Sequence, residues 1–205
     1  MSFGYLGDTS TKIKQVKKND GVISIAEAYE LEKLGHLGGS LELIEEQTVS
    51  GVSAVNFTSI KESAYDVHFL KVCYYQATSS SYMNLRFYES GVLETAGVYE
   101  KTLQYHYWGG TNGENKATGE TQLFTGAEAT TGTNKGNCYV YIYNAGNSAK
   151  YTFITVHASN GSYTTFGGGV MAQASVVDGF NLTSHGGYNF TSKLQLYGVK
   201  QLWVT

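Results

Sequence analysis

The sequence predicts an all-β protein, a two-sheet antiparallel β-sandwich preceded by an N-terminal arm that contains one short helix. From about residue 41 to residue 205, apolar and polar residues alternate with a period of two, as Val140 and Ile142 do with Tyr141 and Tyr143. Loops rich in Gly, Ser, Thr and Asn separate these runs. Aromatic residues make up 14% of the chain and charged residues only 15%, which favours strands and neutral loops.

Residues 1 to about 47 differ in pattern from the rest and are predicted to form a docking arm, with the β-sandwich domain at 48–205. Ser24 followed by Glu27 is a helix capping box, and Gly35 is placed to end the helix that begins there. A helix of roughly ten residues is not stable alone in water. We therefore expect this helix to pack against its own domain, another copy of the chain, or a partner protein.

The alternating runs predict strands near 41–46, 51–57, 65–76, 82–89, 98–108, 121–125, 137–144, 150–158, 165–177 and 194–204. Two polar, glycine-rich stretches, 109–119 and 126–136, flank one of these strands and are predicted to be the longest and most mobile loops. The triplet Gly167-Gly168-Gly169 lacks the Lys-Ser/Thr of a phosphate-binding loop, so we interpret it as a turn or a bend in a sheet.

The charge pattern argues against nucleic-acid binding, because the formal net charge is −3 and phosphate recognition needs concentrated lysine and arginine. The one basic cluster lies within residues 12–18, and Glu27, Glu30 and Glu32 follow it. We expect this arm to be solvated or to face a partner. The chain has neither a leader-like apolar run at its start nor about 20 consecutive apolar residues, so we expect synthesis in a cytoplasm and no membrane insertion.

No constellation of residues in the sequence indicates catalysis or a cofactor. Cys73 and Cys138 lie in predicted strands and are expected to be free thiols. The five histidines occur singly, without the spacing of a metal site. A nucleophile elbow is absent, and the carboxylates carry no pairing signature, so we predict a protein that is not an enzyme and binds no cofactor or metal.

The 17 tyrosines allow two interpretations. Tyrosine is a strong strand former that sits well at the rim of a sandwich, and exposed aromatic rings also bind sugars and anchor protein interfaces. Tyr105, Tyr107 and Trp108 are the residues that we predict for a binding surface.

Three stretches of the β region resemble a sandwich family found in virion proteins of tailed phages, nearest to marine cyanophages. They are VNFTSI at 55–60, YDVHFL at 65–70 and LQLYGV at 194–199. The chain departs from that family at Lys61, where the family often has proline. The segments FGYLGDTS at 3–10 and GGSL at 38–41 are similar to the attachment segment that precedes such modules.

This resemblance implies a jelly-roll-like, non-enzymatic virion structural protein, of a tail-fibre or capsid-decorating type, on the virion surface. It implies that the arm docks on other capsid or tail proteins and that copies associate, often as trimers. The docking residues expected in the arm are Tyr5, Leu6, Lys12, Lys14, Ile25, Tyr29, Leu31 and Leu34. The alternative function is that of an adhesin that binds a glycan of the host surface, and a small hydrolase is a third class.

Overall fold

A computed structural model describes residues 40–129 and 135–200 of the chain. The chain divides into two compact units, residues 1–40 and residues 41–205. The helix predicted after Ser24 and all the expected docking residues lie outside the described residues.

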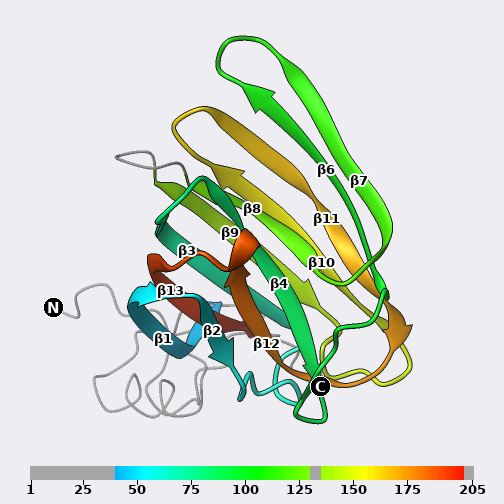
Figure 1. Cartoon of the computed structure of the whole chain (residues 1–205). Coiled ribbons are helices and arrows are strands. Elements are labelled where there is room, and N and C mark those ends of the chain that lie inside the picture. Colours follow the sequence, from blue (N-terminus) through cyan, green and yellow to red (C-terminus); the bar gives the residue numbers. More distant parts are fainter. Residues whose placement is uncertain (1–39, 130–134, 201–205) are drawn as a thin grey trace, which may run out of the picture. The chain divides into compact units, whose positions relative to one another are not determined.

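The described residues form two antiparallel sheets, which confirms the predicted β-sandwich (Figure 1). The large sheet contains, in spatial order, β1 (Leu41–Val52), β13 (Phe190–Val199), β3 (Val67–Ala77), β9 (Gly136–Tyr143), β10 (Tyr151–Ser159), β11 (Tyr163–Ala174), β6 (Tyr99–Tyr107) and β7 (Asn112–Glu120). The small sheet contains β2 (Ala54–Phe57), β12 (Val177–Ser184), β4 (Ser81–Glu89) and β5 (Val92–Leu93), and β8 (Leu123–Ala129) also pairs with β4. A short 3₁₀-helix, His185–Gly187, connects β12 to β13.

The core lies between the two sheets and is built from alternate residues of each strand. Val140 and Ile142 of β9 are fully buried, whereas Tyr139 on the same strand is exposed, as the alternation predicts. From the small sheet, Phe180 stacks on Phe57 with their ring centroids 4.9 Å apart. The inward residues of both sheets are thus buried between them, and the outward residues of the large sheet lie on its outer face.

The β-domain begins closer to residue 40 than to residue 47. Strand β1 starts at Leu41 and pairs with β13, so residues 41–47 belong to the large sheet. It continues to Val52 through a register shift at Gly51, whose φ is +69°. After Ser53 the chain enters β2, which pairs with β12 of the small sheet. The chain therefore crosses from one sheet to the other at this point.

The stretch 109–119 was predicted to be a long loop, and this prediction is wrong. Residues from Asn112 onward form β7, an edge strand that pairs with β6 in a hairpin. The sequence of β7, NGENKATGE, contains almost no apolar residue, so it shows no alternation of apolar and polar residues. Its backbone hydrogen bonds to β6, together with the polar composition suited to an exposed sheet edge, account for the strand.

Three further predictions from the sequence need correction. Strand β12 was not predicted, because it is buried along most of its length and therefore has little polar alternation. Residues 126–129 belong to β8 instead of a loop, and β9 begins at Gly136, while 130–134 lie outside the described residues. The glycine triplet 167–169 lies within β11 and is not a turn.

The glycine triplet serves close packing of backbones within the large sheet. A Cβ added at Gly167 would lie 2.3 Å from the carbonyl oxygen of Thr102, and one at Gly168 would lie 2.4 Å from that of Ile154. Glycine is therefore required for β11 to pass between β6 and β10 here.

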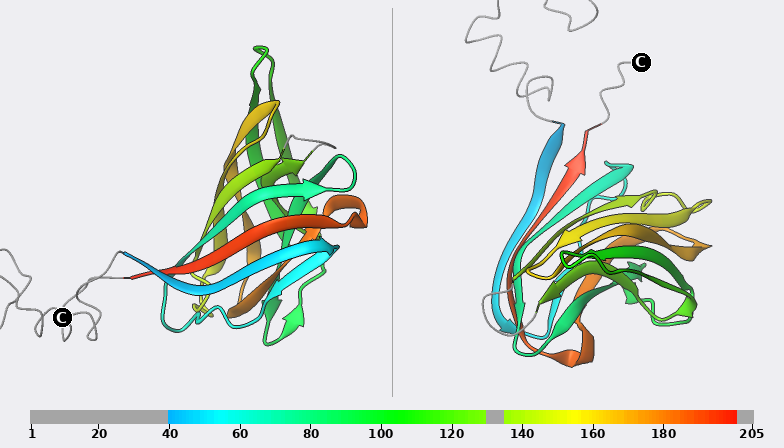
Figure 2. Two further views of the ribbon diagram at one scale, coloured as in Figure 1. Left: turned by 90° about the vertical axis from the view of Figure 1, so that its left-hand side faces the viewer. Right: turned by 90° about the horizontal axis from the view of Figure 1, so that it is seen from above.

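The two sheets differ in width, and this difference positions the candidate sites. The β6–β7 hairpin projects beyond its neighbours, and the views in Figures 1 and 2 agree on this. The inner side of β6, β7 and β11 near this end faces β8 and the start of β4. A cavity is left between them.

Candidate binding surfaces

The predicted binding residues Tyr105, Tyr107 and Trp108 lie at the end of β6 and in the turn that follows. The structure brings the first two together with Tyr163 of β11. The ring centroids of Tyr105 and Tyr107 are 5.7 Å apart, and that of Tyr163 is 6.0 Å from Tyr105 and 5.0 Å from Tyr107. Trp108 is not part of this group: its side chain is 63% exposed, and its backbone N–H donates to the carbonyl oxygen of Ser162 at 3.1 Å.

The three tyrosines line an open cavity of about 180 Å³ at this end of the sandwich, which we call the end cavity. Its lining residues are Tyr82 of β4, Leu103, Tyr105 and Tyr107 of β6, Asn115 of β7, Phe124 and Glu128 of β8, and Tyr163 and Thr165 of β11. Residues from both sheets thus form its walls, and five of the nine are aromatic.

Local sequence explains how the aromatic walls are held. Tyr105 pairs with Gly113 of β7, and a Cβ at Gly113 would lie 2.3 Å from the Tyr105 ring, so the ring covers the glycine. On the opposite wall, Tyr82 packs edge-on against Phe124, with centroids 4.6 Å apart. The other side of Tyr82 stacks on His185 at 4.2 Å. Neighbouring rings and a glycine therefore fix the orientation of the walls.

Two polar groups of the end cavity are removed from solvent, Thr165 almost completely and Glu128 in part. Thr165 is 1% exposed, and its hydroxyl oxygen Oγ1 has no hydrogen-bond partner in the described part of the chain. An unpaired buried polar group costs about 1–3 kcal/mol, so this hydroxyl favours a ligand or water that can pair with it. Burial also raises the pKa of the Glu128 carboxyl above its usual value.

Of the nine lining residues, the sequence predicted Tyr105 and Tyr107 and not the other seven. Glu128 and Thr165 lie on different strands, and only the fold brings them together. Tyr163 carries the one available signal, because it continues the inward alternation of β11 opposite Tyr107. Glu128 lies in the stretch 126–136 that was predicted to be a loop.

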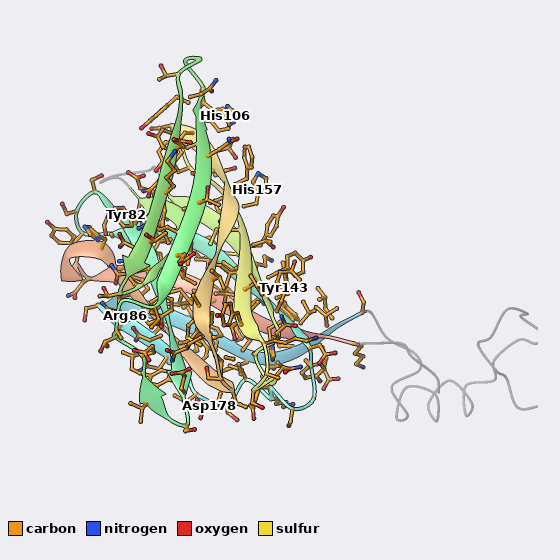
Figure 3. All side chains as sticks on the ribbon, turned by 90° about the vertical axis from the view of Figure 1, so that its right-hand side faces the viewer. Tyr82, Arg86, His106, Tyr143, His157 and Asp178 are labelled. Atoms are coloured by element: carbon orange, nitrogen blue, oxygen red, sulfur yellow. The ribbon has the colours of Figure 1, made fainter. Side chains whose placement is uncertain are left out.

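The outer face of the large sheet carries a second set of aromatic residues, which we call the aromatic face. Phe69 of β3 lies at its centre, with its ring centroid 4.9 Å from Tyr141, 6.0 Å from Tyr139 and 6.0 Å from Tyr197. These neighbours belong to β9 and β13. Toward β7 the face continues with Tyr143, Phe153, His157, Phe166 and His106. Figure 3 shows His106, His157 and Tyr143 along one side of the molecule and Tyr82 on the other.

Hydrogen bonds and ring contacts order the aromatic face. The hydroxyl of Tyr139 and Nδ1 of His157 are 3.0 Å apart, and the hydroxyls of Tyr143 and Thr155 are 3.1 Å apart. Phe166 stacks on His106 with the ring centroids 5.4 Å apart and the planes at 5°. The face is therefore organised before any partner binds.

Two hollows interrupt the aromatic face. The larger, about 670 Å³, lies over Gly168 and is bordered by Phe153 and Thr155 on β10 and by Thr102 and Lys116 on β6 and β7. The smaller, about 390 Å³, is bordered by residues that include Lys71, Tyr139 and His157. Both hollows are open to solvent.

Both cysteines and four of the five histidines lie in the part of the chain that the structure describes. Cys73 and Cys138 are free thiols, as expected, and burial raises the pKa of Cys138 to about 12. His68 is buried, its Nε2 donates to the carbonyl oxygen of Ile60 at 2.8 Å, and burial lowers its pKa. Across 40–129 and 135–200, no three His, Cys, Asp or Glu side chains are grouped in a way that could hold a metal ion.

The residues that carry the family resemblance pack together in the β-domain. The Tyr65 ring covers Gly198, where a Cβ would lie 2.4 Å from the ring. The backbone carbonyl oxygen of Ile60 accepts a hydrogen bond from the His68 ring. Lys61 has a φ of +57°, a conformation that proline cannot adopt.

No protein-family model matches the sequence, and a search of curated proteins likewise gave no match. Among the residues that the structure describes, no helix is long and apolar enough to cross a membrane.

The raised pKa of Glu128 predicts a pH-dependent gain in stability for Glu128→Gln. A raised carboxyl pKa means that the folded state binds the proton more tightly than the unfolded state, so the free energy of unfolding falls as pH rises above about 4.5. Removing the ionisable group should raise the melting temperature by roughly 1–3 °C at pH 7, since the carboxyl is partly solvated, and leave it unchanged at pH 3.

Thermal unfolding followed by circular dichroism at both pH values measures this effect. An equal change at both pH values in Glu128→Gln would contradict the assignment to ionisation.

Proposed function

We propose that this chain is a non-enzymatic virion structural protein of a tailed phage, and that its β-sandwich binds one sugar ring of a host-surface glycan in the end cavity. In this proposal the N-terminal arm docks the protein on the capsid or tail as a decoration or tail-fibre-type module. The binding function rests on the combination of aromatic walls with the buried, unpaired hydroxyl of Thr165 in the end cavity.

The aromatic walls suit the apolar faces of a pyranose. Tyr107 and Tyr163 meet at 63° and Tyr105 and Tyr107 at 87°, so the rings form a corner that can contact a sugar from two sides. Aromatic rings contribute large apolar contact areas, and tyrosine adds a hydroxyl that can remain hydrated or bind the ligand. A corner of this kind favours a ring-shaped ligand with C–H groups on its faces.

The polar groups suit sugar hydroxyls, which both donate and accept hydrogen bonds. The Thr165 hydroxyl, the Asn115 amide and the Glu128 carboxyl line the cavity and offer both donors and acceptors. A bound hydroxyl group would give Thr165 Oγ1 the partner that it lacks. Glu128 is the one carboxylate among the described lining residues, whereas glycosidases ordinarily use two. This favours binding over hydrolysis.

The size of the end cavity supports one ring and not a chain of sugars. Its volume is about 180 Å³. A cavity of roughly 150 Å³ accepts one benzene molecule. The remaining sugars of a glycan would lie outside, where the exposed Trp108 follows Tyr107 at the rim. We therefore propose recognition of a terminal sugar.

The virion assignment is supported by the resemblance of 55–60, 65–70 and 194–199 to sandwich domains of phage virion proteins. The residues of these stretches pack as a unit, as the family's packing motifs would require. A virion protein must be anchored as well as exposed, and the sequence before Leu41 provides a separate unit for anchoring.

A glycan array followed by calorimetric titration with the bound sugar tests the binding function. We expect Tyr107→Ala to weaken binding by about tenfold or more, because it removes an exposed wall of the cavity worth about 1.4 kcal/mol. Tyr188→Ala is the matched control, since both tyrosines are 42% exposed and only Tyr107 lines the cavity.

Tyr107→Phe, which keeps the ring, should retain most of the affinity. No bound glycan, or equal losses in Tyr107→Ala and Tyr188→Ala, would contradict the proposal. Release of free sugar during the titration would instead indicate a hydrolase.

Deletion of residues 1–40 tests the anchoring role. We expect the shortened protein to unfold cooperatively like the parent, because β1 begins at Leu41, and to be lost from assembled particles. Mass spectrometry of purified virions measures incorporation. Normal incorporation of the folded, shortened protein would defeat the docking proposal and leave the sugar-binding proposal intact.

A further inference from the structure

We propose that two copies of this chain associate face to face through the aromatic face, about a two-fold axis that crosses β11 between Phe166 and Gly168. The inference does not depend on sugar binding, because the end cavity lies on the inner side of the large sheet and the aromatic face lies on the outer side.

A projecting ring and a hollow lie side by side on β11. Phe166 points outward and is 42% exposed, and Gly168, two residues along the same strand, forms the floor of the 670 Å³ hollow. Gly168 cannot acquire a side chain, because its Cβ would meet the carbonyl oxygen of Ile154. The strand therefore presents a knob and a hole that are adjacent on one face.

A two-fold axis can insert each knob into the hole of the other copy. When two sheets pack face to face, the axis lies in the plane of the interface. We call a row the set of outward residues that pair across neighbouring strands. If the axis runs across the strands, midway between the row of Phe166 and the row of Gly168, then the Phe166 row of one copy faces the Gly168 row of the second copy. Each strand then faces the same strand of the second copy. Phe166 of each copy then enters the hollow over Gly168 of the second copy.

The charges at the edge of the sheet match under the same axis. The strand registers place Thr155, Thr102 and Lys116 in the row of Gly168. They place His157, Gln104 and Glu114 in the row of Phe166. Within one chain, Lys116 Nζ already lies 2.6 Å from Glu114 Oε1. Under this axis, Lys116 of each copy also faces Glu114 of the other copy, so two such pairs join into one cluster of four charges with alternating sign.

The next two rows also match. Glu100 pairs with Val170, and His106 pairs with Thr164, which places these two β6 residues in the outermost rows on either side of the axis. Glu100 of one copy then faces His106 of the second copy. An ammonium group thus meets a carboxylate at β7, and a carboxylate meets an imidazole ring at β6. These complementary pairs fix the register of the two sheets.

The alternative axis, along β11, fits poorly. It would set Phe166 against Phe166 of the second copy and leave the two hollows facing each other. It would also place Lys116 and Glu114 against the aromatic residues Tyr141 and Tyr139 on β9, which supply no opposite charge. Shape and charge thus select the axis that crosses the strands.

The area of the contact is of the order that a stable dimer needs. The five strands from β9 to β7 are about 4.8 Å apart, and four outward rows span about 20 Å, so the patch covers roughly 500 Å² in projection. Side chains roughen this surface and increase its accessible area. Specific interfaces bury about 800 Å² per partner. Aligned sheets keep their strand directions within about 30° of each other, and the row pairing at β7 requires a crossing angle at the small end of that range.

Charge reversal at the paired positions tests the inference. Lys116→Glu and Glu114→Lys each place like charges opposite each other in a homodimer. A mixture of the two variants restores two opposite-charge pairs, and so does the double variant Lys116→Glu/Glu114→Lys. Sedimentation velocity of the full chain, at low ionic strength, measures the association against the chain mass of 22.3 kDa.

We expect the parent chain, the mixture and the double variant to sediment as dimers, and each single variant to show at least about a tenfold weaker association. Phe166→Ala should weaken the dimer similarly. Tyr151→Ala is the matched control, since it is 45% exposed on the same face but lies outside the four rows, and it should leave the dimer unchanged.

A parent chain that is monomeric or trimeric would overturn the inference. It would also be overturned by a mixture that associates no better than its two components, or by equal effects of Phe166→Ala and Tyr151→Ala. Retained sugar binding in the Phe166→Ala protein would separate this result from the proposed function.

Discussion

The arrangement of this protein depends on the unequal width of two packed sheets. Eight strands of the described residues form one sheet, and five form the other. The small sheet closes the hydrophobic core over the inner face of the large sheet, with Phe57, Phe180 and Val140 fully buried. It leaves a cavity beside the β6–β7 hairpin, and it does not cover the outer face of the large sheet. Figure 2 shows how far this hairpin extends beyond the neighbouring strands.

Because of this constraint, strands β6, β7 and β11 carry a different surface on each side of the large sheet. On β6, Tyr105 and Tyr107 point into the end cavity, while Gln104 and His106 lie on the aromatic face. The cavity combines aromatic walls with a buried, unpaired hydroxyl, a combination suited to a small polar ring. The aromatic face is broad and self-complementary in shape and charge, which suits a second copy of the chain. We therefore assign ligand binding and self-association to opposite sides of the large sheet.

Much of the fold could be predicted from the sequence, because in a half-buried strand apolar residues on the buried face alternate with polar residues on the exposed face. Val140, Tyr141 and Ile142 are one such case. The edge strand β7 was not predicted because neither of its faces is apolar. Strand β12 was not predicted because nearly all of its residues are buried, so it lacks polar alternation. The candidate site was predicted only at Tyr105 and Tyr107. The other lining residues come from strands far apart in the sequence, and pairing between strands, which leaves no local signal, brings them together.

The measurement that tests this division most directly is backbone amide NMR of the labelled protein during titration with the sugar selected by array. Our account predicts shift changes at Tyr105, Tyr163 and Thr165 around the end cavity, with the amides of Phe153 and Phe166 on the aromatic face unchanged. Changes that concentrate on the aromatic face and spare the end cavity would contradict it.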